Sequence, residues 1–266
     1  MITQGRQNIR WLSIGRNQVT YLSRGRYNIS LSPYSTEATA ALLAQFQTKW
    51  PTIRDYGFAH PALVPFINED PMLVMSLIEG LGTRWLVGTG TGYFDSGVKA
   101  MPATTAKCKV RYDSSQSTRM DIFGERSDAN NHQYSFYVSY STNFAPNYLR
   151  FLNGSNTETA LLLNSGIYEI ELEPNVFKIN ESQYSCGTNV GSQYNIIVMG
   201  VRYNETNNGQ GMNGQGMDAL IMKNTSGGDK WFIPFKRNGQ MELLDLVSGN
   251  LATRVGTFTE LIESPS

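Results

Sequence analysis

Three acidic residues stand at alternate positions in the short sequence EIELE, at Glu169, Glu171 and Glu173. This alternation predicts a strand, with the carboxylates on one face and Ile170 and Leu172 facing a core. Paired carboxylates hydrolyse glycosidic bonds, one as the nucleophile and one as the acid and base. A solvent-facing polar row has the same pattern, and a strand face alone does not set the separation that the reaction requires. We therefore predict that the protein is not an enzyme, and the alternative is a glycoside hydrolase that uses Glu169 and Glu173.

Aromatic residues are dense in the stretch HQYSFYVSYSTNFAPNYLRF. Because aromatic rings can stack on sugars, Tyr137, Tyr140 and Tyr148 are candidate glycan contacts. The same alternation places Tyr134 and Phe136 on the strand face opposite to Tyr137. We therefore expect part of this aromatic run to lie in the core.

The sequence has no evident cluster of metal ligands or phosphate loop. Two glycine-rich stretches, GTGTG and GQGMNGQGMD, lack the following helix with Lys-Ser/Thr that phosphate binding requires. The two cysteines form no CxxC pair, so we expect them to be reduced, and the sequence leaves open whether they pair. We predict no metal and no cofactor, because the candidate ligands are scattered along the sequence. They are His60, His132, Cys108, Cys186 and the acids Asp95, Asp113, Asp121 and Asp128.

The chain begins with three copies of a ten-residue unit, GRQNIRWLSI, GRNQVTYLSR and GRYNISLSPY. Residues 1–34 carry five arginines and no acid, so their net charge is +5, and residues 35–266 must carry −5 because the total is zero. Apolar residues alternate after each Gly-Arg, which predicts three short strands joined by tight turns. Because three strands cannot cover their own apolar side, we expect an assembly arm that packs on other chains. Its candidate contact residues are Arg6, Arg10, Trp11, Arg16, Tyr21, Arg24 and Arg26.

The rest of the chain divides into two regions. Residues 35–79 contain a predicted helix over 36–49, which ends before Pro51, and then a proline-rich connector that we expect to be extended and unpacked. From 80 to 266, strand patterns recur at short intervals, which predicts a sandwich or barrel. No apolar run approaches the ~18 residues of a spanning helix, and the first residues have no apolar signal region. We therefore expect synthesis in the cytosol and no membrane partner.

Several motifs resemble a known family. The series GTGTGYFDSGVKA, DIFGERSD, LRFLNG, GIYEIELEPNVFKINES and DKWFIPFKRNGQMELLDLVSGNLATRVGTFT is similar to the laminin-G-like, concanavalin A-like jelly rolls of bacteriophage and gut-bacterial proteins. The resemblance covers about residues 84–260, and the closing motif is its most specific part. It implies a mainly β fold, a jelly-roll sandwich preceded here by the β-repeat arm and one short helix. Many members bind carbohydrate on the concave face or at edge loops, so the resemblance also implies carbohydrate binding. Some glucanases of this fold carry an ExDxE motif, which EIELE resembles.

These features together favour a bacteriophage virion structural protein, such as a head or tail fibre, decoration or adaptor subunit. A lectin-like domain without an export signal fits a protein assembled in the host cytoplasm and displayed on a particle. The arm would bind other virion proteins, with its strands covered in a homo-oligomer, for which a trimer is favoured, and the jelly roll would face a host-surface glycan. A nucleic-acid role is disfavoured, because arginines that alternate with apolar residues suit a packed interface. The alternative is a bacterial carbohydrate-binding module.

Overall fold

The computed structural model describes residues 21–24, 27–30, 70, 83–115, 120–126, 133–141, 144–154, 159–162, 164–202 and 211–263. At some strand positions, among them 137–141 and 144–148, only the backbone is described. The regular elements in these ranges are all strands, and the helix expected over 36–49 lies outside them. Within the same ranges the chain has no helix of the length and apolar character needed to cross a membrane.

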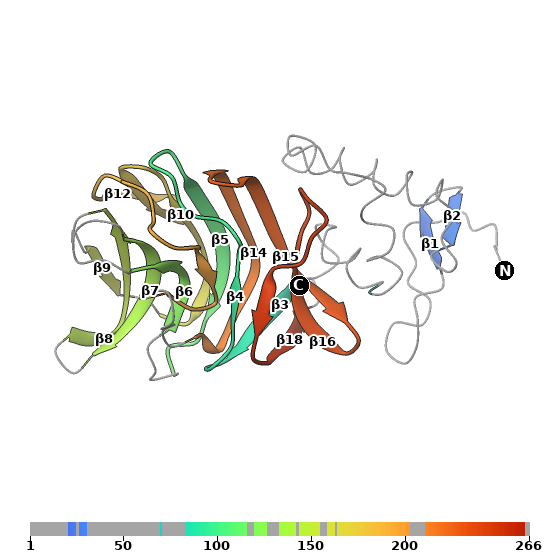
Figure 1. Ribbon diagram of the computed structural model, residues 1–266. Helices are drawn as coiled ribbons and strands as arrows, with labels where there is room; N and C mark the ends of the chain where they lie inside the picture. Colours follow the sequence, from blue (N-terminus) through green and yellow to red (C-terminus); the bar gives the residue numbers. More distant parts are fainter. Residues whose placement is uncertain are drawn as a thin grey trace.

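Most of the described chain forms two antiparallel sheets that pack into a sandwich (Figure 1). The nine-stranded sheet contains, in spatial order, β12 (Ser182–Ser185), β11 (Val176–Ile179), β10 (Gly166–Leu172), β5 (Thr105–Tyr112), β14 (Asn213–Thr225), β15 (Gly228–Arg237) and β16 (Gln240–Asp245), with β3 (Thr83–Thr89) beside β14 and β18 (Phe258–Glu263) beside β3. The seven-stranded sheet contains β17 (Thr253–Val255), β4 (Tyr93–Asp95), β13 (Ile197–Val198), β6 (Met120–Glu125), β7 (Tyr134–Ser141), β8 (Phe144–Asn153) and β9 (Thr159–Leu162). This all-β architecture confirms the expected sandwich and is consistent with a jelly roll.

Alternating residues build the core between the sheets. Along β5, Cys108 and Val110 are buried while Lys109 between them is exposed, which is the period-two pattern of a strand with one solvent face. Aromatic rings then join the two sheets. Phe177 of the nine-stranded sheet stacks on Phe151 of the seven-stranded sheet, with ring centroids 4.1 Å apart. This ring contact helps to set how the two sheets pack against each other, and thereby the position of the loops that connect them.

The proline-rich connector, which we expected to be unpacked, is packed at Asp70. This carboxylate is 4% exposed and binds the guanidinium of Arg84, which is 3% exposed. It also accepts a hydrogen bond of 2.7 Å from the backbone N–H of Lys236. The register of β15 with β14 ends at Phe232, so this N–H lies beyond their pairing. Asp70 supplies an acceptor there, as a buried backbone donor requires.

The N-terminal repeat forms a separate two-stranded sheet. β1 (Tyr21–Arg24) and β2 (Tyr27–Ser30) pair in antiparallel register and belong to the second and third ten-residue units. The strands predicted in these two units are therefore present, on either side of Gly25 and Arg26. The first unit lies outside the described residues, and the role of the arm stays a prediction.

Candidate functional site

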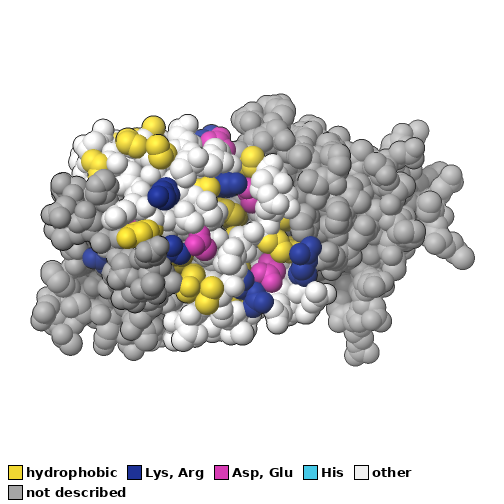
Figure 2. Space-filling model, viewed as in Figure 1, with side chains coloured by type: hydrophobic (Ala, Val, Ile, Leu, Met, Phe, Trp, Pro, Cys, Tyr) yellow, Lys and Arg dark blue, Asp and Glu magenta, His cyan; other side chains and the backbone are white. Residues whose placement is uncertain are grey.

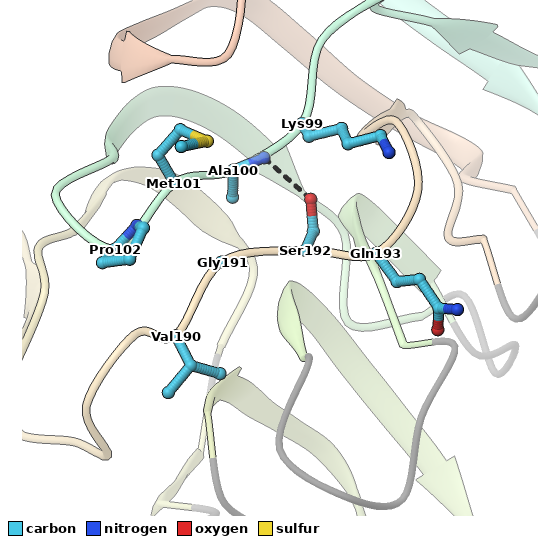
Figure 3. A pocket seen from close by; sticks show the side chains of 8 residues that line it. All are labelled: Lys99, Ala100, Met101, Pro102, Val190, Gly191, Ser192 and Gln193. Carbon is cyan, nitrogen blue, oxygen red and sulfur yellow. Dashed lines mark hydrogen bonds between the residues drawn. The ribbon is translucent and has the colours of Figure 1, made fainter.

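One pocket lies where two connections between the sheets meet (Figure 3). The first connection links β4 to β5 and the second links β12 to β13, so each crosses from one sheet to the other. The pocket has a volume of about 430 Å³. It is lined by Lys99, Ala100, Met101, Pro102, Val190, Gly191, Ser192 and Gln193.

Hydrogen bonds hold the two connections against each other. The N–H of Ala100 donates to Ser192 Oγ at 2.7 Å, the bond drawn in Figure 3, and the N–H of Ser192 donates to the Ala100 carbonyl at 2.9 Å. Asn189 Nδ2 donates to the Met101 carbonyl at 2.6 Å. Gly191 has a φ of 89°, and a Cβ there would lie 3.0 Å from the Ala100 oxygen. Glycine is therefore required for this close approach.

The chemistry that the pocket offers is limited. The backbone N–H groups of Ala100, Gly191 and Ser192 already donate to protein atoms, so they cannot cradle an anion. Polar contact would come from Lys99 and Gln193, and apolar contact from Met101, which is 44% exposed. Its lining holds no carboxylate, so it has no general acid or base of that type.

The EIELE acids lie on the outer face of the nine-stranded sheet. Glu169 pairs with Lys107 at 2.5 Å, and Glu173 binds Lys178, which also lies 3.6 Å from Glu171. Ile170 and Leu172 are fully buried, which confirms the predicted alternation. The side chains of Glu169 and Lys107 are 48% and 43% exposed. The described pocket does not include this row.

The candidate glycan tyrosines lie on the seven-stranded sheet. Tyr134 and Phe136 are core residues, as predicted, so alternation assigns position 137 to the outer face. The register places Tyr137 opposite Asp121 of β6 on one side and Arg150 of β8 on the other. We call this set the Asp121–Tyr137–Arg150 row; only the backbone of Tyr137 and Arg150 is described.

Two further positions extend the row. Tyr148 pairs with Ser139, two residues along β7 from Tyr137, so it shares the outer face with the row. Ser135 lies on the same face in the other direction, and its hydroxyl is buried without a hydrogen-bond partner. Tyr140 falls where the β7–β8 register shifts, so its face is not set by alternation. The register thus places Tyr137 and Tyr148 on one face of the sheet and does not assign Tyr140 to either face.

The remaining predicted residues fall into two groups. Tyr21 and Arg24 belong to β1, whereas Arg6, Arg10, Trp11, Arg16, Arg26, His60, His132 and Asp128 lie outside the described residues. Asp95 and Asp113 have structural partners, Asp95 binding Arg202 and Asn195, and Asp113 binding the backbone and side chain of Ser115. In the described ranges no group of three or more His, Cys, Asp or Glu side chains is placed to hold a metal. Both cysteines are free.

Sequence patterns missed three features. The pocket joins residues 99–102 to residues 190–193, and no local pattern links segments so far apart. Arg150 was not singled out, although the alternation in NYLRFLN places it on the same strand face as Tyr148. The third feature is Asp218 of β14. Burial raises the pKa of its carboxyl to about 7, and the nearby charge of Lys109 lowers it in part.

The surface around these features is chemically mixed. On the face shown in Figure 2, hydrophobic side chains of the described residues lie in small groups between Lys, Arg, Asp and Glu. Large apolar patches mark protein or membrane contacts. That face has none among the described residues.

Comparison with known proteins gives a distant structural likeness. No protein-family model matches the chain, and no curated protein matches it. Among solved structures, the chain is similar to a Bacteroides ovatus protein described as a "putative carbohydrate binding protein", with 12% identity and a TM-score of 0.48. The match covers 68% of this chain, which spans 60% of the length of that protein.

Proposed function

We propose that the chain is a non-catalytic carbohydrate-binding protein of the laminin-G-like, concanavalin A-like jelly-roll kind. The observation that carries this proposal is the Asp121–Tyr137–Arg150 row, which crosses three neighbouring strands on the outer face of the seven-stranded sheet. Directly opposite residues on antiparallel strands have Cβ atoms about 5 Å apart, so the register sets Tyr137 and Arg150 side by side, with Asp121 on the next strand.

The residue types suit a sugar. An aromatic ring such as that of Tyr137 packs against the apolar face of a pyranose, while a guanidinium such as that of Arg150 donates hydrogen bonds to hydroxyl groups. Paired strands are rigid supports, which limits the entropy lost on binding. The Asp121 carboxylate is fully buried, so direct contact with a sugar would fall to Tyr137 and Arg150 on the two neighbouring strands.

The composition of the row and the surroundings of the EIELE acids support the non-catalytic part of the proposal. The row contains a single carboxylate, whereas glycoside hydrolysis by the common mechanisms uses two. The acids of EIELE face solvent on the opposite sheet and are engaged by Lys107 and Lys178.

The test is glycan binding by the full-length protein. We expect binding on an array of host-surface and bacterial glycans, followed by calorimetry with the best ligand. Tyr137→Ala and Arg150→Ala should each weaken binding about tenfold, the equivalent of about 1.4 kcal/mol. Tyr137→Phe keeps the ring and Lys109→Ala lies on the other sheet, so both should bind normally. No binding on the array, or equal affinity in all four variants, would overturn the proposal.

As a second function we propose a virion role, which the β1–β2 hairpin favours. Within the described residues the hairpin forms its own sheet, and no pairing joins it to either sheet of the sandwich. Edges of a two-stranded sheet are suited to pairing with other chains, so the arm would join this subunit to virion proteins and to its own copies in a trimer. The sandwich would then display its glycan site on a particle assembled in the host cytoplasm.

Particle incorporation tests this second function. Deleting residues 1–34 should leave a soluble sandwich that unfolds cooperatively and is missing from purified virions by mass spectrometry. Normal incorporation of the truncated protein would contradict the anchoring role. Sedimentation equilibrium of the full-length protein should give a trimer, and a monomer at micromolar concentration would contradict self-association through the arm.

A further inference from the structure

The pocket between the β4–β5 and β12–β13 connections has an apolar side and a polar side (Figure 3). In this view Met101, Pro102 and Val190 lie on the left, and the side chains of Lys99 and Gln193 extend to the right. The residues between the two sides are small, namely Ala100, Gly191 and Ser192. A ligand in this hollow would therefore contact apolar atoms at one end and polar side chains at the other.

The apolar side of the pocket is both exposed and rigidly supported. The side chains of Met101 and Val190 are 44% and 43% exposed. The N–H of Met101 donates to Thr104 Oγ1 at 2.6 Å, and its carbonyl accepts from Asn189 Nδ2 at 2.6 Å, so the backbone beneath the side chain is held in place. A ligand that covered these side chains would remove apolar surface from water at little cost in backbone ordering.

The polar side of the pocket carries a lysine without an ionic partner. The N–H of Lys99 donates to Ser226 Oγ at 2.9 Å, but within the described part of the chain its ammonium has neither an ion pair nor a hydrogen bond. Other lysines of the sandwich are each paired with a carboxylate, among them Lys107, Lys178, Lys230 and Lys236. An ammonium group brings a positive charge and three donors, so Lys99 complements an anion.

The backbone around the pocket is already paired, so the ligand has to be held by side chains. Ala100 and Ser192 donate to and accept from each other, and the N–H of Gln193 donates to the carboxylate of Glu125 at 3.4 Å. Strand addition, a common way to bind an extended peptide, needs free backbone groups. The volume of about 430 Å³ is at the lower end of small-molecule sites, which span about 300–1,000 Å³. A small anion on an apolar body fits these features better than a peptide.

We propose that this pocket binds a sugar that carries a carboxylate, such as a glucuronic acid residue. The C–H groups of the pyranose ring would pack on Met101, Pro102 and Val190, and the carboxylate would bind the ammonium of Lys99. The amide of Gln193 offers hydrogen bonds to the hydroxyl groups. The pocket shares no residue with the Asp121–Tyr137–Arg150 row, so it would be a second glycan site, and one that selects for charge.

Carbon-13 NMR of the methionine methyl groups in the full-length protein tests the proposal. Titration with sodium glucuronate should shift the methyl signal of Met101, which Met101→Leu assigns. The signals of the core residues Met217 and Met222 should stay in place. Glucose has the ring without the carboxylate and acetate has the carboxylate without the ring, so each should need an at least tenfold higher concentration for the same shift. A response to either control equal to that to glucuronate would overturn the proposal.

Two substitutions of Lys99 test the role of its charge. Lys99→Gln should weaken glucuronate binding about tenfold, whereas Lys99→Arg keeps the charge and should retain most of the binding. Lys107→Gln, at a side chain 43% exposed on the nine-stranded sheet, is the matched control and should bind as the unmodified protein does. No shift of the Met101 methyl, or unchanged binding by Lys99→Gln, would contradict the site. Because the readout is Met101, either result concerns the pocket alone and leaves glycan binding by the row to its own test.

Discussion

The carboxylate of Asp245 accepts a hydrogen bond of 3.0 Å from the backbone N–H of Trp231, 14 residues earlier on the neighbouring strand. It also accepts hydrogen bonds from the N–H of Val247 at 3.1 Å and from Lys230 Nζ at 3.0 Å, and from Ser248 Oγ at 2.5 Å. Asp245 belongs to LLDLVSGN, within the motif that resembles a known family most specifically. This part of the motif therefore closes the turn after β16 and ties it to β15, which is a folding role.

Asp245→Ala should destabilise the protein by about 2–4 kcal/mol, because buried N–H groups and a lysine would lose their acceptor. Asp245→Asn keeps an acceptor oxygen and should cost less. Urea unfolding followed by tryptophan fluorescence measures both. Glu181→Ala, at an exposed turn position, is the control and should change stability by less than about 0.5 kcal/mol. An Asp245→Ala variant as stable as this control would contradict the folding role of Asp245.

The buried pair of Asp70 and Arg84 should behave as a unit. Asp70→Ala leaves the Arg84 guanidinium buried, with Glu260 at 3.4 Å as its remaining charged partner among the described residues, and should cost about 3–5 kcal/mol. Adding Arg84→Met removes the charge, so the double variant should be more stable than Asp70→Ala alone. A double-mutant cycle by chemical denaturation measures this coupling. Additive losses would show that the two side chains act independently.

The sandwich could be predicted from sequence because its signal is local. In β5 and β10 alternation by itself separates buried residues such as Val110 and Ile170 from exposed ones such as Lys109 and Glu169. The closing motif adds specificity because Asp245 must meet a fixed set of turn donors. Both features depend on residues close together in the chain.

The candidate sites could not be predicted, because they depend on contacts between distant segments. The pocket needs Ala100 to meet Ser192, and the Asp121–Tyr137–Arg150 row needs the register of three strands, including a shift between Asp121 and Phe123. A shift of one residue in a strand moves its side chains to the other face. Asp70 was assigned to an unpacked connector because neighbouring prolines disfavour regular structure, which says nothing about a tertiary ion pair.

We expect that the EIELE acids do not catalyse the hydrolysis of glycosidic bonds. Glu169→Gln with Glu173→Gln breaks exposed ion pairs with Lys107 and Lys178, which are worth about 0–1 kcal/mol each. The free energy of unfolding of the variant should lie within about 2 kcal/mol of that of the unmodified protein. Neither protein should release reducing sugar from β-glucans. If the unmodified protein released reducing sugar and the double substitution abolished that release, the EIELE acids would be catalytic.

The two thiols should differ in reactivity. Burial raises the pKa of Cys108 well above its usual value, and burial also raises that of half-buried Cys186, against a partial lowering by a hydrogen bond from Asn153. Because the thiolate is the reactive form, both should react slowly with iodoacetamide at pH 8, Cys186 first and Cys108 only after unfolding. Peptide mass spectrometry over time distinguishes them. Rapid labelling of Cys108 in the folded protein would contradict its burial.

Asp218 should make stability depend on pH in an unusual direction. Burial raises the pKa of its carboxyl from 3.8 to about 7, and the nearby charge of Lys109 lowers it only in part. A raised acid pKa means that the folded state holds its proton more tightly than the unfolded state. The resulting stabilisation is fully present below about pH 4 and is lost as the pH rises toward 7, with a total on the order of 4 kcal/mol.

Asp218→Asn removes this titration, since the amide carries no charge at any of these pH values. The unfolding free energy of the variant, minus that of the unmodified protein, should therefore increase between pH 4 and pH 7 and level off above about pH 8. Urea unfolding at half-unit pH steps measures the difference, and subtracting the two curves cancels the titration of the other carboxylates. Glu181→Gln neutralises an exposed acid and should give a nearly flat difference over the same range. A flat difference for Asp218→Asn would show that the carboxyl of Asp218 is hydrated in the folded protein and titrates as it does in the unfolded chain.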